Sequence, residues 1–210
     1  MSTTQGLSII DVDSHITEPH DLWTSRAPLA LRDRVPRVVG EGKKRSWVVD
    51  TNVALTAAMP SSVIRKDGSK SRGVEFLGWQ IEDVHVACYD MKARVEILDR
   101  FGLNAQIVYP NVAGFGSQNF MKVEDGELRL ACARIYNDAM AEIQADSRGR
   151  LLPMALMPWW NIEQSVQEVE RAKALGLKGI VMCSDPDSIG LPDLGDDAWK
   201  PFWEDRKSVV

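Results

Sequence analysis

The chain has 210 residues, of which 44% are hydrophobic and 26% are charged, with a formal net charge of -5 and a pI near 5.3. This composition is typical of a folded globular protein, and without any block of like charges it argues against nucleic acid or an anionic membrane as a partner. No apolar run approaches the roughly 18 residues of a membrane span, and the amino terminus lacks a signal-peptide pattern, so we expect a cytoplasmic protein.

Cysteines and tryptophans are both interpreted as core residues. The three cysteines, Cys88, Cys132 and Cys183, are an odd number, far apart and without a C-x-x-C pair. This spacing indicates neither a disulfide framework nor a cysteine zinc site, so we expect buried free thiols. Most of the seven tryptophans are expected to pack between helices and sheet.

The first strand is expected over residues 7–15, where the apolar run LSII continues into DVDSH. Because side chains alternate along a strand, this predicts Asp11, Asp13 and His15 on one face. A carboxylate and an imidazole two residues apart at a strand end can bind one divalent cation. A hydrogen-bonded polar strand end is the alternative, and the pattern alone leaves both open.

The spacing itself is weak evidence, because all three histidines of the chain have an acid two residues before them. Glu18-Pro-His20 flanks a proline in an expected loop, and Asp83-Val-His85 lies farther along, outside the expected strands. We interpret His20 and His85 as surface or supporting residues, since an isolated histidine without a placed partner is usually not a ligand.

Residues 17–89 form a long insertion after the first strand. The segment contains four prolines, the pieces GEGKKR and KDGSKSRG, and one expected strand at SWVVDT. A plain loop of this length is improbable in a compact domain, so we expect the insertion to have structure of its own and consider it a candidate lid.

From residue 90 onward, helical patterns alternate with short apolar runs, which predicts βαβ units and a parallel sheet covered on both faces. Helices are expected over 90–102, 126–150 and 161–176, and strands over 105–109, 151–160 and 179–184. Asp90 and Asn161 are predicted N-caps, and Gly102 is a predicted left-handed C-cap. In the first of these helices, Arg94 and Asp99 are interpreted as a solvated pair.

The end of the chain is unusual. A last helix carrying Trp199, Phe202 and Trp203 runs to the terminus with no element left to pack beneath. The final hexapeptide, DRKSVV, is what GATCGGAAGAGCGTCGTG encodes, and this is a common sequencing-adapter stretch read in frame. We therefore hypothesise that residues 205–210 are a non-native tail and that the protein continues past Glu204, with a natural stop as the alternative.

Three stretches carry a family resemblance: IIDVDSHITEPHDLW, then YDMKARVEILDRFGLNAQIVYPN, then RLLPMALMPWWNIEQSVQEVERAKALGLKGIVM. In this order and spacing the chain resembles the amidohydrolase-related family, which includes aminocarboxymuconate semialdehyde decarboxylase and the resorcylate and carboxyvanillate decarboxylases. The resemblance implies a distorted (β/α)8 barrel with a divalent metal, zinc or manganese, at the C-terminal ends of the strands. Asp13 and His15 match the two first-strand ligand positions, and an acid in the first of them shifts the preference toward manganese.

The chain also departs from the family. The resemblance implies a third histidine ligand, a catalytic histidine and a late aspartate, but no histidine follows His85. A barrel needs eight strands and about 250 residues, whereas four strands are recognised here. We therefore expect an α/β fold in which residues 1–204 are the N-terminal part of one barrel domain with its first four strands. The catalytic residues are unassigned and expected in the missing C-terminal half.

The resemblance implies decarboxylation or hydrolysis of a small aromatic or unsaturated carboxylate by the complete enzyme, which would be a homodimer. Asn111 and Trp159 follow strands and would stand at the barrel mouth, where substrate binds. Two other interpretations stay open. The chain could be a non-catalytic fragment or a small-molecule or metal-binding α/β module, or it could be a complete four-stranded doubly wound domain with a ligand crevice.

Overall fold

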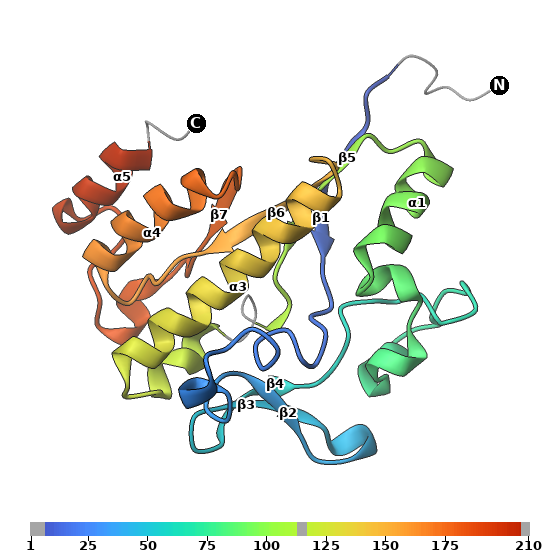
Figure 1. The fold of residues 1–210 in the computed structure, drawn as a ribbon, viewed down its shortest axis with the longest axis horizontal. Helices are drawn as coiled ribbons and strands as arrows, with labels where there is room; N and C mark the ends of the chain where they lie inside the picture. Colours follow the sequence, from blue (N-terminus) through green and yellow to red (C-terminus); the bar gives the residue numbers. More distant parts are fainter. Residues whose placement is uncertain (1–6, 113–116, 207–210) are drawn as a thin grey trace.

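A computed structural model describes residues 7–112 and 117–206 of the chain (Figure 1). Four parallel strands form its central sheet. The strands are β1 (Ile10–His15), β5 (Ala105–Tyr109), β6 (Leu151–Leu156) and β7 (Gly179–Val181). Their order, β1-β5-β6-β7, follows the chain without reversal. A doubly wound domain needs a point where the strand order reverses, so that alternative is wrong.

Helices follow these strands, as the periodicity predicted. They are α1 (Met91–Phe101), α3 (Gly126–Asp146), α4 (Ile162–Ala174) and α5 (Lys200–Arg206), and Figure 1 shows α3 and α4 in front of the sheet. The predicted caps of α1 are confirmed: Asp90 Oδ1 accepts the N–H of Ala93 at 3.0 Å, and Gly102 has φ 69°. Asn161 likewise caps α4 through the N–H of Gln164, at 2.9 Å. Local signals therefore fix these helix ends.

The strands differ in how closely they match the sequence prediction. Residues 105–109 form a strand as predicted, 151–156 are the strand part of the predicted 151–160, and the last strand covers only 179–181. The sheet is not covered throughout, because Ile10 and Val12 of β1 are more than half exposed, at 51% and 59%. Among the described residues β1 pairs only with β5, so it lies at an edge of the sheet.

The insertion contains a second, antiparallel sheet. Its strands are β2 (Arg37–Val39), β3 (Ser46–Val49) and β4 (Val53–Ala57), in the order β2-β3-β4. Short 3-10 turns occupy Leu29–Leu31, Gly42–Lys44, Glu75–Gly78, Ile81–Asp83 and Val86–Cys88. The predicted strand at 46–51 is the central one of the three, and its two partners were not predicted.

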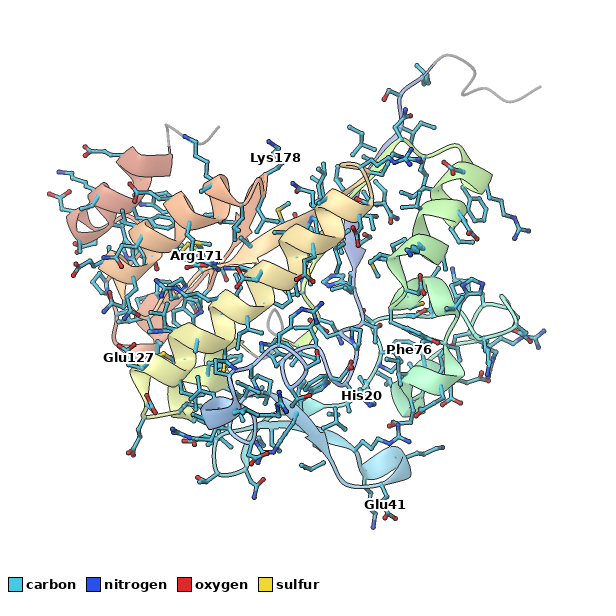
Figure 2. All side chains as sticks on the ribbon, in the orientation of Figure 1. His20, Glu41, Phe76, Glu127, Arg171 and Lys178 are labelled. Atoms are coloured by element: carbon cyan, nitrogen blue, oxygen red, sulfur yellow. The ribbon has the colours of Figure 1, made fainter. Side chains whose placement is uncertain are left out.

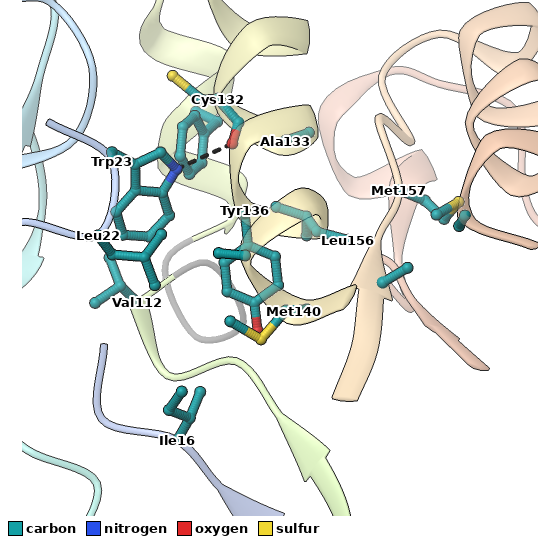
Figure 3. Close-up of a cluster of buried hydrophobic side chains, with 14 of the residues drawn as sticks. Ile16, Leu22, Trp23, Val112, Cys132, Ala133, Tyr136, Met140, Leu156 and Met157 are labelled. Carbon is teal, nitrogen blue, oxygen red and sulfur yellow. Dashed lines mark hydrogen bonds between the residues drawn. The ribbon is translucent and has the colours of Figure 1, made fainter. Parts of the chain in front are cut away.

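One hydrophobic core joins the insertion to the parallel sheet (Figure 3). Trp23 of the insertion is fully buried, and its Nε1 donates a hydrogen bond to the Cys132 carbonyl of α3 at 2.9 Å. Its ring stacks on Tyr136 with 6.0 Å between centroids and meets Trp47 edge-on at 5.5 Å. The insertion is therefore part of the fold rather than a separate module.

The three cysteines are free and buried, as predicted. Burial raises the pKa of the Cys132 thiol to about 12, so this group stays protonated. Five tryptophans are likewise buried, and Trp160 and Trp203 are partly buried against the same core. Both residue types therefore have the packing role that the composition indicated.

The last helix does not lack a packing partner, so that expectation is wrong. Trp199 and Phe202 are fully buried in the main core, and α5 packs back on α4. The Trp199 indole N–H also donates to the Pro192 carbonyl at 3.0 Å. Residues 207–210 lie outside the described residues, so the hypothesis of a non-native tail stays untested.

Within the described ranges, no helix has the length and apolar character needed to cross a membrane.

Candidate metal site at the end of the first strand

The register between β1 and β5 shifts between Asp11 and Ser14. Three residue steps along β1, from Asp11 to Ser14, lie beside two steps along β5, from Gln106 to Val108. Asp11 lies beside Gln106, whose Nε2 donates to Asp11 Oδ2 at 2.8 Å. His15 lies beside Tyr109, with ring centroids 5.9 Å apart, and therefore on the opposite face. The expectation that Asp11 and His15 share a face is wrong, because one extra residue in the strand reverses the alternation.

Side chains satisfy the backbone groups at this irregularity. Asp11 Oδ1 accepts the N–H of Asp13 at 3.2 Å, and Ser14 Oγ donates to the Ile107 carbonyl at 3.0 Å. Both interactions replace ladder hydrogen bonds, which backbone groups otherwise need. Asp11 is therefore a structural acid that shapes the strand end.

The His15 ring is oriented by a backbone carbonyl. Its Nδ1 lies 3.1 Å from the Pro110 oxygen, at the carboxyl end of β5. A carbonyl oxygen only accepts, so Nδ1 is the donor in this contact, and Nε2 is the ring nitrogen with which His15 could bind a metal ion. Metal-ligating histidines commonly have this arrangement, in which the second nitrogen is held by a carbonyl or carboxylate. The ring therefore fits the role of a ligand.

Asp13 has an exposed side chain, and its carboxylate makes no hydrogen bond to any described residue. One carboxylate and one imidazole suit a divalent ion such as manganese or zinc. No group of three or more His, Cys, Asp or Glu side chains is arranged for a metal within residues 7–112 and 117–206. The two residues thus fit part of a metal site, and their role as ligands stays a prediction.

Arg94 of α1 fixes the end of β1. Its Nη2 donates to the His15 carbonyl at 2.8 Å, and burial lowers the pKa of this guanidinium. The interpretation of Arg94 and Asp99 as a pair is wrong, because Asp99 binds Arg150 Nη1 at 2.8 Å. Arg94 shares a helix face with the buried Leu98, four residues on, and this position was the signal that could have revealed its burial.

Glu18 is a buried acid that sequence reasoning missed. It is only 1% exposed, and its Oε1 accepts the N–H groups of Asn111 at 2.8 Å and Val112 at 3.0 Å. This carboxylate ties the segment after β1 to the segment after β5. Burial, together with the charge of Glu18, raises the pKa of Tyr136 well above its ordinary value.

The two predicted substrate residues have structural contacts. Asn111 Nδ2 donates to the carbonyl of Met59 in the insertion, at 3.0 Å. Trp159 is fully buried, and its indole N–H has no acceptor among the described residues. Both follow strands as expected, β5 and β6 respectively. Their role in substrate binding stays a prediction.

The other two histidines have local surroundings in the insertion. His20 meets Trp47 edge-on with 5.8 Å between ring centroids, and Figure 2 labels it above the insertion sheet. Burial, and next the positive charge of Arg45, lowers the pKa of His20. His85 Nδ1 accepts the N–H of Ala87 at 3.2 Å and caps a 3-10 turn. These contacts fit the interpretation of both as supporting residues.

A cleft of about 730 Å³ lies elsewhere, between α1 and the carboxyl end of α3. Met91, Val95 and Ile143 line it together with charged residues that include Arg148. Neither Asp13 nor His15 reaches this cleft. It is therefore separate from the candidate metal site.

No protein-family model and no curated protein sequence matches the chain. Among solved structures, an amidohydrolase from Mycobacterium avium subsp. paratuberculosis matches 97% of this chain at 18% identity, with a TM-score of 0.68. The chain shares its fold with part of this amidohydrolase. A dihydroxybenzoic acid decarboxylase from a Polaromonas species, solved with manganese and the inhibitor 2-nitroresorcinol, matches 96% at 17% identity with a TM-score of 0.51. IDCase from Metarhizium anisopliae matches 88% at 10% identity with a TM-score of 0.50.

The chain spans about half the length of these structures, covering 56% of the Mycobacterium amidohydrolase, 47% of the Polaromonas decarboxylase and 44% of IDCase. The amidohydrolase fold agrees with the resemblance seen in the sequence. Four parallel strands in chain order, with helices between them, are consistent with part of a barrel.

Proposed function

We propose that this chain carries part of the divalent-metal site of an amidohydrolase-type enzyme that decarboxylates or hydrolyses a small aromatic or unsaturated carboxylate. The observation that carries the proposal is the His15 ring, whose Nδ1 is held by the Pro110 carbonyl at the carboxyl edge of a parallel sheet. In barrel enzymes this edge carries the active site. Asp13, two residues earlier, supplies the carboxylate.

Manganese is our first choice of metal and zinc the second. A carboxylate oxygen beside an imidazole nitrogen accommodates either ion, and the carboxylate favours the harder one. The manganese in the Polaromonas decarboxylase supports this choice. When bound, such an ion acts as a Lewis acid toward a substrate oxygen. His15 would hold it through Nε2, with Arg94 and Pro110 fixing the backbone and the ring.

We favour decarboxylation over hydrolysis, because the Polaromonas structure is that of a decarboxylase for an aromatic carboxylate. The chain spans about half the length of its structural neighbours, so the activity of the complete enzyme belongs to this proposal. The groups that move protons are assigned to no residue of this chain. A homodimer and a cytoplasmic location are further parts of the proposal that await tests of their own.

Metal binding by this chain is the first test. Titration calorimetry with manganese chloride and zinc chloride should detect binding to the wild type and at least a tenfold weaker affinity after Asp13→Asn with His15→Asn. The asparagine at 15 keeps a donor near the Pro110 carbonyl while removing Nε2. The matched control is Asp83→Asn with His85→Asn, the same Asp-x-His spacing away from the strand end, and it should bind as the wild type does.

Equal loss of affinity in both double variants, or none in either, would refute Asp13 and His15 as ligands. A second readout is turnover in any form of the protein that is active with metal. There, replacing Asp13 and His15 together by alanine should abolish metal-dependent turnover. Retained activity would contradict the ligand assignment.

A further inference from the structure

Three buried N–H donors without acceptors lie together beyond the end of β6. They are Trp159 Nε1, Trp160 Nε1 and Arg129 Nε, and none has a hydrogen-bond partner in the described part of the chain. The two indole rings are 6.1 Å apart between centroids, and the Arg129 Cζ lies 5.3 Å from the Trp160 ring centroid. Trp160 therefore joins the three groups into one cluster, which we call the donor corner.

The donor corner can donate hydrogen bonds but cannot accept them. An indole nitrogen has one N–H and no available lone pair, and a guanidinium has five N–H groups and no acceptor. Buried polar groups in native proteins are nearly always hydrogen-bonded, because an unmatched one keeps the cost of losing its water. A ligand that completes this corner must therefore supply acceptor atoms.

Arg129 also forms no ion pair with a residue of the ranges 7–112 and 117–206. Its Nη1 donates to the sulfur of Met121, at 3.2 Å, which is a weak acceptor. Asp125, whose charge acts on Arg129, is used elsewhere: Oδ1 accepts the N–H of Leu128 at 3.1 Å and Oδ2 pairs with Arg34 at 3.0 Å. Burial lowers the pKa of the Arg129 guanidinium, as expected for a cation that is partly desolvated. The missing acceptor is thus best supplied by an anion.

The surroundings of the corner are flat and aromatic. Phe120 stacks on Trp160 with 6.4 Å between centroids and 22° between planes, and Phe120 and Trp159 are fully buried. Planar unsaturated groups pack well against such rings. The corner lies after β6, at the same edge of the sheet as His15, where Trp159 was predicted to meet substrate.

We propose that Arg129, Trp159 and Trp160 bind the carboxylate group of a small planar carboxylate, with the Arg129 guanidinium as its ion-pair partner and the indole N–H groups as further donors. Guanidinium and carboxylate form short, charge-assisted hydrogen bonds, often two in parallel. The identity of this ligand as the substrate rests on the proposed function. Its binding to the donor corner does not require the metal.

Benzoate is the probe, titrated by calorimetry into the metal-free chain in the presence of EDTA. The wild type should bind benzoate, and benzamide, which has the same shape without the charge, should bind at least about tenfold more weakly. Arg129→Gln should weaken benzoate binding by a similar factor, with Arg129→Lys in between. The matched control is Arg148→Gln, an exposed arginine just after α3, which should leave the affinity unchanged.

Trp160→Phe keeps the ring and removes one donor, so it gives a second test that does not depend on the folding of the Arg129 variants. This substitution should weaken the binding of benzoate more than the binding of benzamide. Equal binding of benzoate and benzamide, or equal effects of Arg129→Gln and Arg148→Gln in chains that unfold at the same temperature, would overturn the proposal. So would no benzoate binding by the wild type.

The two proposals fail differently. Loss of manganese binding with benzoate binding intact would remove the metal-site function and keep the donor corner. Manganese binding that depends on Asp13 and His15, without any effect of Arg129 on benzoate, would remove the donor corner alone.

Discussion

The parallel sheet with its helices and the insertion between β1 and α1 are ordered by different means. In the first region, backbone ladders and helix caps set the structure, and the partners are close in sequence or in neighbouring strands. In the insertion, strands are short, and long-range side-chain contacts fix them to the rest. An insertion with little local regularity is thus attached to the sheet region through a few buried groups.

Contacts of three residues carry this attachment. Trp23 donates to the Cys132 carbonyl of α3, and the Ser61 hydroxyl donates to the Ile16 carbonyl at 3.0 Å beside the end of β1. Glu18 completes it from the segment after β1, by accepting backbone N–H groups that follow β5. If these groups hold the insertion and the sheet together as one cooperative unit, their loss should destabilise the whole chain and not the insertion alone.

Trp23→Ala should have the largest effect on stability. It removes a fully buried ring and leaves the Cys132 carbonyl without its donor, so we expect a loss of about 3–5 kcal/mol in the free energy of unfolding. Urea unfolding followed by circular dichroism measures this loss. Trp23→Phe keeps most of the ring and should cost less. An unchanged main transition, with a separate early one for the insertion, would show that the two regions are independent.

Glu18→Gln should have the next largest effect. The amide keeps the shape of the side chain but loses the charge that strengthens its bonds to the Asn111 and Val112 N–H groups, so we expect a loss of about 1.5–3 kcal/mol. Glu41→Gln is the matched control, because Glu41 is exposed in the same insertion and its side chain makes no capping hydrogen bond. Equal midpoints in urea for the two variants would contradict the role given to Glu18.

His20→Gln should have the smallest effect, which is a change in how the free energy of unfolding depends on pH. The folded-state pKa of His20 lies below the ordinary histidine value of about 6.5, so at pH values around and below 6.5 the unfolded chain binds more protons than the folded one. The contribution of His20 to the free energy of unfolding is therefore fully present above about pH 6.5 and is lost as the pH drops through the lowered pKa. Comparing urea unfolding near pH 7.5 and near pH 5.5, the wild type should lose more stability than His20→Gln. Parallel losses would rule out this contribution.

The sequence predicts the sheet region well because its signals are local. Asp90 and Asn161 lie where a side chain can cap the first turn, and Gly102 occupies a left-handed position that glycine favours. The insertion is less predictable, because β2 and β4 are three and five residues long and are defined by pairing with β3. Neither carries a period that can be recognised alone.

The candidate site divides in the same way. Asp13 and His15 could be selected from their spacing at a strand end, whereas nothing in the sequence around Glu18 indicates a carboxylate that is 1% exposed. Arg129 is another such case, since whether Asp125 pairs with Arg129 or with Arg34 depends on where these side chains lie in space. Contacts of this kind arise from the tertiary arrangement, which periodicity does not encode.

The shift in β1 has a consequence for sequence alignment. In a regular strand the parity of the residue number tells which face a side chain occupies, yet here Asp11 and Ser14 share a face although one number is odd and the other even. A related chain with one residue fewer between them would show the same two faces with an unbroken ladder. A one-residue gap at this point therefore leaves the face that His15 occupies unchanged.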